Sequence, residues 1–139
     1  FGHRFKLKEL LFLWTVIIFH LVIFINLILK NFWGRLRPNE ILEFGGSGVF
    51  TPWYQITNYC NTNCSFVSGD AAVGFSLIIF FFLLKKEIYF KLALFFGIVF
   101  GLIRISEGGH FLSDIIMSCF IVFSFSFLIH LYYIKKIDG

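Results

Sequence analysis

Charged side chains are scarce in this chain. Only 14% of its 139 residues are Asp, Glu, Lys or Arg, while 58% are hydrophobic and 22 are phenylalanine. A soluble domain of this length keeps too large a share of its surface in water to hide so much apolar material. The composition therefore excludes a soluble globular domain and predicts an integral membrane protein.

Features of several other protein classes are also missing. The net charge of +4 is modest and the cations are dispersed, so nothing indicates nucleic-acid binding. No carboxylates or histidines have metal-ligand spacing, so no cofactor is expected. No charged stretch precedes a small-residue cleavage site, which argues against a signal peptide. Because the chain starts with Phe1 and not with Met, we expect an N-terminally incomplete fragment.

Four apolar runs predict an all-α bundle with four transmembrane helices. They cover residues 10–29, 65–84, 88–103 and 111–133. Each has roughly the 20 residues that a spanning helix needs. No repeat or linker divides them, so residues 1–139 are expected to form a single membrane-embedded domain. The one long connection, residues 31–64, contains both prolines and predicts an outer loop.

The basic residues fall unequally on the two sides of this bundle. One side has Arg4, Lys6, Lys8, Lys85, Lys86, Lys91, Lys135 and Lys136, and the other has Lys30, Arg35, Arg37 and Arg104. Because cytoplasmic segments carry the excess of Lys and Arg, both termini are predicted to be cytoplasmic. The long loop would then face the periplasm from a bacterial inner membrane.

A first motif, Lys30-x6-Arg37-Pro38, ends the first apolar run. If the segment is helical, Lys30 and Arg37 lie two turns apart on one face, where both can bind phosphate oxygens. Snorkelling of both side chains at the membrane edge is the plainer alternative. Arg35, between them, is expected to snorkel or to contact lipid headgroups.

A second motif, Ser68-Gly69-Asp70, opens the second apolar run. The N-terminus of a helix presents free backbone N–H groups that bind anions such as phosphate. Ser68 or Asp70 would also cap this helix, and capping is compatible with anion binding.

A third motif, Arg104-x5-His110-x3-Asp114, joins the last two runs. His110 and Asp114 are four residues apart and share one face of a helix. A carboxylate bonded to one ring nitrogen fixes the imidazole tautomer and leaves the other nitrogen free to attack. Arg104 lies across a turn that contains Gly108 and Gly109. A histidine cap beside an unrelated acid is the alternative.

In this order the motifs resemble the type 2 phosphatidic acid phosphatase family, which shares its site with vanadium haloperoxidases. The family pattern is K-x6-RP, then PSGH, then SR-x5-H-x3-D. Lys30 to Pro38 matches the first part, and Arg104 to Asp114 matches the third, with Ile103 where Ser is usual. The resemblance covers about residues 10–133. It implies a six-helix protein, of which this chain would contain four helices.

The resemblance also implies a role for each matching residue. His110 is the nucleophile that forms a phosphohistidine, and Asp114 orients it. The phosphate is held by Lys30, Arg37, Ser68, Gly69 and Arg104. Since these groups supply the positive charge, the implied phosphatase is independent of metal.

The second motif departs from the family pattern. Val67 replaces Pro, and Asp70 stands where the family has the His that protonates the leaving alcohol. An Asp can act as this acid only when it is protonated, which a nearby phosphate dianion favours. The alternative is a helix cap in an inactive family member with a structural role.

The stretch Asn63-Cys-Ser-Phe-Val-Ser-Gly69 resembles the bacterial lipid A phosphatases of this family. We therefore expect hydrolysis of a phosphomonoester of lipid A, a substrate taken from the bilayer. Undecaprenyl pyrophosphate and phosphatidylglycerol phosphate are the alternative substrates. The sequence leaves the phosphate position and the oligomeric state open.

Two further pairs of residues allow alternatives. Cys60 and Cys64 bracket part of the outer loop and would form a disulfide in an oxidising compartment, although free thiols remain equally open.

His20 and His130 lie within helices and raise the alternative of a haem protein. Their depths differ by on the order of 10 Å, which argues against one shared haem. A haloperoxidase is disfavoured because those relatives are soluble.

Overall fold

The computed structural model describes residues 6–138, with side chains to residue 133. Arg4, and the side chains of Lys135 and Lys136, which belong to the basic side predicted above, lie outside the described part. The described chain is helical, as the apolar runs predict. Three helices are long and apolar enough to cross a membrane, and a shorter apolar helix accompanies them.

The first long helix runs from Leu7 to Phe32. It consists of α1 (Leu7–Ile17), a π-helical stretch (Ile18–Leu29) and α2 (Lys30–Phe32). It ends before Gly34, whose φ of +70° lies in the left-handed region. A Cβ at this position would lie 1.7 Å from the carbonyl oxygen of Thr57, so only glycine fits. The chain therefore leaves the helix here and enters the outer loop.

The second apolar run forms two short helices, α3 (Gly69–Phe75) and α4 (Ile78–Leu84). The break lies at Ser76, whose hydroxyl donates to the carbonyl oxygen of Ala72 at 2.6 Å and contacts His20 Nε2 at 3.0 Å. The expectation of four full spanning helices is thus corrected to three plus this shorter pair. Residues 65–68 do not extend α3 because they belong to the candidate site described below.

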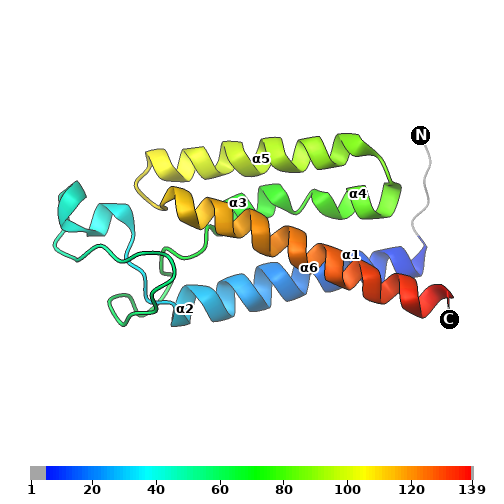
Figure 1. Cartoon of the computed structure of the whole chain (residues 1–139), viewed down its shortest axis with the longest axis horizontal. Coiled ribbons are helices and arrows are strands. Elements are labelled where there is room, and N and C mark those ends of the chain that lie inside the picture. The colour runs from blue at the N-terminus through cyan, green and yellow to red at the C-terminus, as the bar shows by residue number, and fades with distance from the viewer. Residues whose placement is uncertain (1–5, 139) are drawn as a thin grey trace.

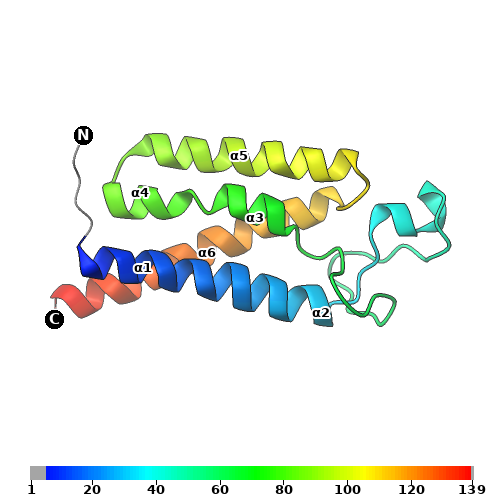
Figure 2. The ribbon, with the colours of Figure 1, turned by 180° about the vertical axis from the view of Figure 1, so that it is seen from behind.

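The remaining helices are α5 (Glu87–Ser106) and α6 (Leu112–Asp138). α3 packs closely against α5, and a Cβ on Gly74 would lie 2.6 Å from the backbone nitrogen of Gly97. Small residues permit such close approach of helices in membranes. α6 crosses the α3–α4 pair in front of it in Figure 1, and therefore behind it in Figure 2. The buried core between the helices includes Ile25, Phe66, Phe75, Ile78, Ala93 and Val122.

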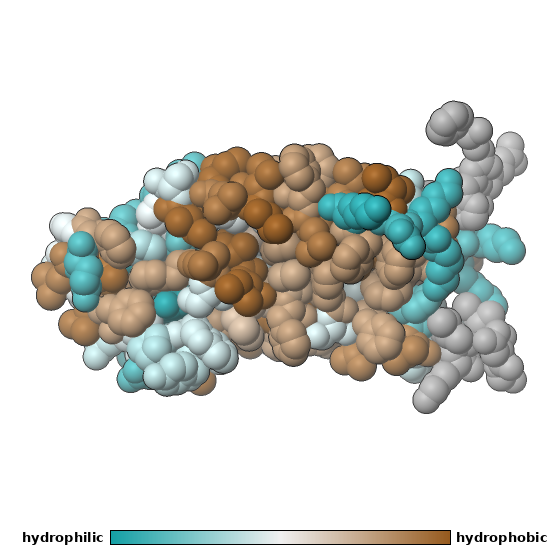
Figure 3. Space-filling model, turned by 45° about the horizontal axis from the view of Figure 1, so that its top comes forward, coloured by the Kyte–Doolittle hydropathy of each residue, from teal (hydrophilic) through white to brown (hydrophobic). Residues whose placement is uncertain are grey.

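The bundle has two unlike ends (Figures 1 and 2). One end carries the start of α1, the α4–α5 turn and the end of α6. The other end carries the outer loop, the start of α3 and the α5–α6 turn, so all three motifs meet there. On the face shown in Figure 3, apolar side chains cover the middle of the bundle and hydrophilic ones gather toward its ends. Large apolar side chains are exposed on the bundle, including Phe120 at 64%, as a lipid-facing surface requires.

Candidate active site

His110 lies in the turn between α5 and α6. Gly108, at φ +66°, makes the bend, and its carbonyl oxygen accepts a hydrogen bond of 3.1 Å from the backbone of Asn39 in the outer loop. The imidazole is 1% exposed. Neither ring nitrogen has a hydrogen-bond partner among the described residues. A buried imidazole with free nitrogens is unusual, because buried polar groups are nearly always paired.

Asp114 lies in the first turn of α6, whereas His110 precedes that helix, so the two do not share the helix face that their spacing predicts. Its Oδ2 lies 3.7 Å from His110 Nδ1, an ion-pair distance that is too long for the hydrogen bond expected from the sequence. The carboxylate is instead held by the hydroxyl of Ser65 at 2.6 Å and by the backbone N–H of Phe111 at 2.9 Å. It is fully buried. Its orientation is therefore fixed by the surrounding chain and not by the imidazole.

Arg35 is the main residue that sequence reasoning missed. The expectation that it snorkels is wrong, because the side chain is 2% exposed and pairs with Asp114 Oδ1 at 2.5 Å. The turn at Gly34 directs Arg35 into the protein. Burial lowers the pKa of its guanidinium below the ordinary value, and the neighbouring Asp114 carboxylate opposes that shift. Nothing in the sequence signals this pair, since 79 positions separate its members.

Lys30 and Arg37 converge, but not by the helical geometry that their spacing suggests. The helix ends at Phe32, and Arg37 is extended. Lys30 Nζ lies 3.4 Å from Asn63 Oδ1, and Arg37 donates to the Asn63 carbonyl oxygen at 2.9 Å. Asn63 thus brings both cations together, and it is a second residue that sequence reasoning did not single out.

The second motif lies directly beside these cations. A Cβ on Gly69 would lie 3.4 Å from Lys30 Nζ, so the ammonium sits over the start of α3. Ser68 caps this helix, accepting from the backbone N–H of Ala71 at 3.4 Å. Ser68 is buried, whereas Asp70, two residues further along, is 59% exposed.

Arg104 joins the second motif to the third. Its Nε lies 3.0 Å from Asp70 Oδ2, and its NH1 pairs with Glu107 at 2.5 Å. A Cβ on Gly109 would lie 3.3 Å from its NH2, so the guanidinium lies along the turn that carries His110. The structure therefore brings every predicted site residue to one end of the bundle.

A disulfide joins Cys60 and Cys64 in the outer loop. The loop pairs through its backbone with α2 and with the segment that follows it. Cys64 N donates to Lys30 O at 2.9 Å, and Cys60 N donates to Gly34 O at 3.1 Å. This pairing holds Asn63, which lies within the disulfide loop, against the two cations that it contacts.

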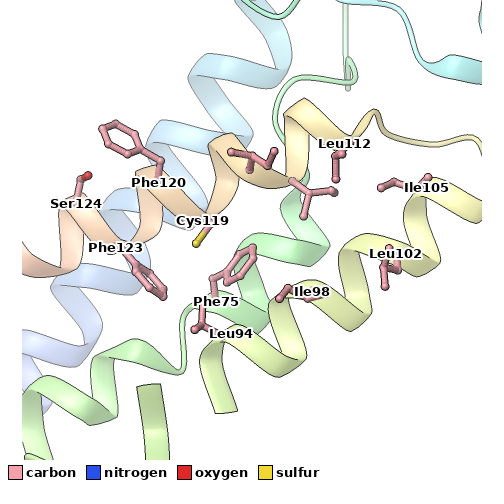
Figure 4. A pocket seen from close by; sticks show the side chains of 12 residues that line it. Phe75, Leu94, Ile98, Leu102, Ile105, Leu112, Cys119, Phe120, Phe123 and Ser124 are labelled. Carbon is pink, nitrogen blue, oxygen red and sulfur yellow. The ribbon is translucent and has the colours of Figure 1, made fainter. Parts of the chain in front are cut away.

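An apolar cavity of about 500 Å³ lies between α5 and α6, with Phe75 of α3 pointing into it (Figure 4). A separate hollow of about 440 Å³ contains His110. Ile105 and Leu112 line both, so they separate the candidate nucleophile from the apolar cavity. A third hollow, about 350 Å³, contains Asp70 and Arg104.

The described residues contain no group of three or more His, Cys, Asp or Glu able to hold a metal ion. The two histidines considered for haem binding contact different protein groups. His20 contacts Ser76, and His130 Nε2 lies 3.0 Å from Lys85 Nζ.

Comparison with known proteins independently supports the family resemblance. Three curated relatives, each called "Lipid A 4'-phosphatase", are similar to this chain. The relative from Francisella tularensis subsp. novicida (strain U112) is 40% identical over 117 residues, which is 81% of this chain and 53% of that protein. The relative from Rhizobium leguminosarum is 34% identical, over 69% of this chain and 42% of that protein. The relative from Rhizobium etli (strain ATCC 51251 / DSM 11541 / JCM 21823 / NBRC 15573 / CFN 42) is 36% identical, over 68% and 38%.

The chain thus spans about half the length of these curated relatives or less. No solved structure gave a significant match. The family model described as the PAP2 superfamily matches residues 9–138, which include all three motifs. With this match, the resemblance inferred from the sequence is confirmed: the chain belongs to the PAP2 superfamily.

Proposed function

We propose that this chain carries the active site of a membrane lipid phosphatase that removes a phosphate group from lipid A. One observation carries the proposal. Lys30 and Arg37 meet at Asn63 beside the start of α3, and Arg104 lies along the turn that carries a buried histidine. Neither ring nitrogen of this histidine has a hydrogen-bond partner among the described residues. Cations arranged in this way bind phosphate oxygens and stabilise the charge that develops during transfer. The printed names of the relatives support lipid A as the substrate.

The proposed reaction has two displacement steps. A ring nitrogen of His110 attacks phosphorus, and the bond to the lipid oxygen breaks. The leaving oxygen takes a proton from Asp70. Water then attacks the phosphohistidine and gives a proton to the Asp70 carboxylate, while the phosphorus–nitrogen bond breaks, which releases inorganic phosphate and regenerates the imidazole. Lys30, Arg37 and Arg104 hold the phosphate oxygens in both steps, so the proposed chemistry needs no metal.

A lipid substrate also accounts for the apolar cavity between α5 and α6. We propose that a hydrocarbon chain of the substrate lies there while its phosphate reaches His110 past Ile105 and Leu112. The cavity is lined almost wholly by apolar side chains, as an acyl chain requires. The site would face the periplasm from the bacterial inner membrane, with the basic end of the bundle in the cytoplasm.

Phosphate release tests the proposal. The purified full-length protein and His110→Ala are supplied with lipid A, undecaprenyl pyrophosphate or phosphatidylglycerol phosphate in detergent, with and without EDTA. We expect the fastest release from lipid A, no effect of EDTA, and no release by the variant. An acid-labile, alkali-stable label on His110 would identify the intermediate. Absence of turnover on all three substrates would support an inactive member with a structural role.

A further inference from the structure

The buried guanidinium of Arg35 is not accounted for by phosphate binding. It lies inside the protein behind Asp114, among the side chains that hold the carboxylate. Lys30, Arg37 and Arg104, by contrast, are the cations gathered around the start of α3 and the His110 turn. An arginine is costly to bury unless it is paired and hydrogen-bonded.

Every polar contact of Arg35 fixes it relative to the third motif or the outer loop. Its NH1 donates to Asp114 Oδ1 at 2.5 Å and to the Ser113 hydroxyl at 2.8 Å. Its Nε donates to the carbonyl oxygen of Thr51 at 3.0 Å. The guanidinium also lies over the ring of Phe111, 4.1 Å from the centroid. Lysine could not reproduce this set of contacts, because it is a single point charge without a planar fork.

These contacts divide the two oxygens of Asp114 between different tasks. Oδ1 is held by Arg35, while Oδ2 is held by Ser65 and Phe111 and lies nearest to His110 Nδ1. Rotation of the Asp114 carboxylate about its Cβ–Cγ bond would break these contacts. Arg35 therefore prevents Asp114 from presenting the wrong oxygen and supplies the positive charge that a buried carboxylate needs.

We propose that Arg35 is a positioning residue of the phosphatase site: it acts through Asp114 to orient His110 and does not bind the substrate phosphate. The inference rests on the proposed function, in which His110 is the nucleophile. Under this proposal the cations of the first motif have two different functions. Lys30 and Arg37 bind phosphate, whereas Arg35 organises the nucleophile.

The test compares kcat and KM for lipid A in detergent. Arg35→Met should lower kcat by on the order of tenfold to a hundredfold, as loss of a supporting partner does elsewhere, with KM within about twofold of wild type. Arg35→Lys should recover part of kcat, since the charge returns without the fork. Arg37→Met should instead raise KM. Lys86→Met, an exposed basic residue at the opposite end of the bundle, is the matched control and should leave both constants unchanged.

A double-mutant cycle separates positioning from a general structural role. If Arg35 acts through Asp114, then Arg35→Met combined with Asp114→Asn should be no slower than Asp114→Asn alone. If the effects of the two single substitutions on kcat multiply in the double variant, the inference is overturned. It is also overturned if Arg35→Met raises KM and leaves kcat unchanged. If Arg35→Met does not fold, Arg35→Lys carries the test, and a wild-type kcat in that variant would refute the proposal. Activity in His110→Ala would refute the proposed function itself.

Discussion

At the scale of single residues, the site depends on which charges are free and which are already paired. Asp114 is neutralised by Arg35 in the interior, whereas Asp70 and Glu107 contact Arg104 near the surface. An interior carboxylate held on both oxygens cannot readily exchange partners. Asp70 is 59% exposed and can turn toward a substrate. The two carboxylates are therefore suited to different roles, Asp114 to orientation and Asp70 to proton transfer.

Asp70→Asn tests the second of these roles. The variant should slow release of phosphate from lipid phosphates by about a hundredfold, because their alkoxide leaving groups need a proton. It should spare para-nitrophenyl phosphate, whose leaving group is stable without one. Asp70→His should retain activity on lipid phosphates and move the pH profile upward, because imidazole stays protonated to higher pH than a carboxyl group. Equal rates for Asp70→Asn and wild type on both substrates would leave Asp70 only as an ion-pair partner of Arg104.

At the scale of elements, the features that the sequence predicts depend on residues close together in the chain. The features that it does not predict depend on contacts between residues far apart in the chain. Apolar runs predicted the helices, and short motifs predicted which side chains gather at one end of the bundle, because both depend on neighbours within a few turns. The pairing of Arg35 with Asp114 joins the outer loop to α6, and no local pattern records it. The helical geometry assumed for Lys30 and Arg37 failed because the helix ends at Phe32 and Gly34 takes a left-handed conformation. Thr57, far along the chain, leaves no room for a side chain at Gly34. At the break between α3 and α4, Ser76 likewise contacts His20 from another helix.

The disulfide loop offers a test at this scale. Replacing both Cys60 and Cys64 by Ser should loosen Asn63 and thereby the two cations that it contacts. We expect KM for lipid A to rise by roughly fivefold or more with a smaller change in kcat, because substrate-positioning groups are displaced while His110 is not. Lys86→Met is the control, since that exposed residue lies at the opposite end of the bundle from the loop. An unchanged KM in the double variant would show that the loop holds its shape without the bond.

The apolar cavity between α5 and α6 makes a second prediction about elements. Cys119→Trp should fill part of the cavity and raise KM for a long-chain lipid phosphate by at least about fivefold, because an acyl chain could no longer enter. The same variant should hydrolyse para-nitrophenyl phosphate at the wild-type rate. Leu128→Trp, on α6 but outside the cavity lining, serves as the control. Loss of activity on both substrates in Cys119→Trp would indicate a disturbed bundle and not a blocked chain.

At the scale of the whole molecule, the bundle separates a basic end from a catalytic end. This polarity predicts which residues are reached from each side of the membrane. A cysteine introduced at Ser47, in the exposed outer loop, should react with a membrane-impermeant maleimide added to intact spheroplasts. A cysteine introduced at Lys86, in the exposed α4–α5 turn, should react only after the membrane is opened. The reverse pattern would place the catalytic end in the cytoplasm.

The two carboxylates around Arg104 have a consequence for turnover. Three positive charges lie at this end of the bundle, on Lys30, Arg37 and Arg104. Two carboxylates, those of Asp70 and Glu107, pair with Arg104. Inorganic phosphate is an anion like the substrate, so carboxylates that compete for Arg104 should help to expel it. Glu107→Gln should therefore strengthen product inhibition by phosphate about two- to fivefold, the range for a partly exposed ion pair. Inhibition constants measured with para-nitrophenyl phosphate would show it, and a weaker inhibition would contradict it. On this view Glu107 keeps the enzyme from being trapped by its own product.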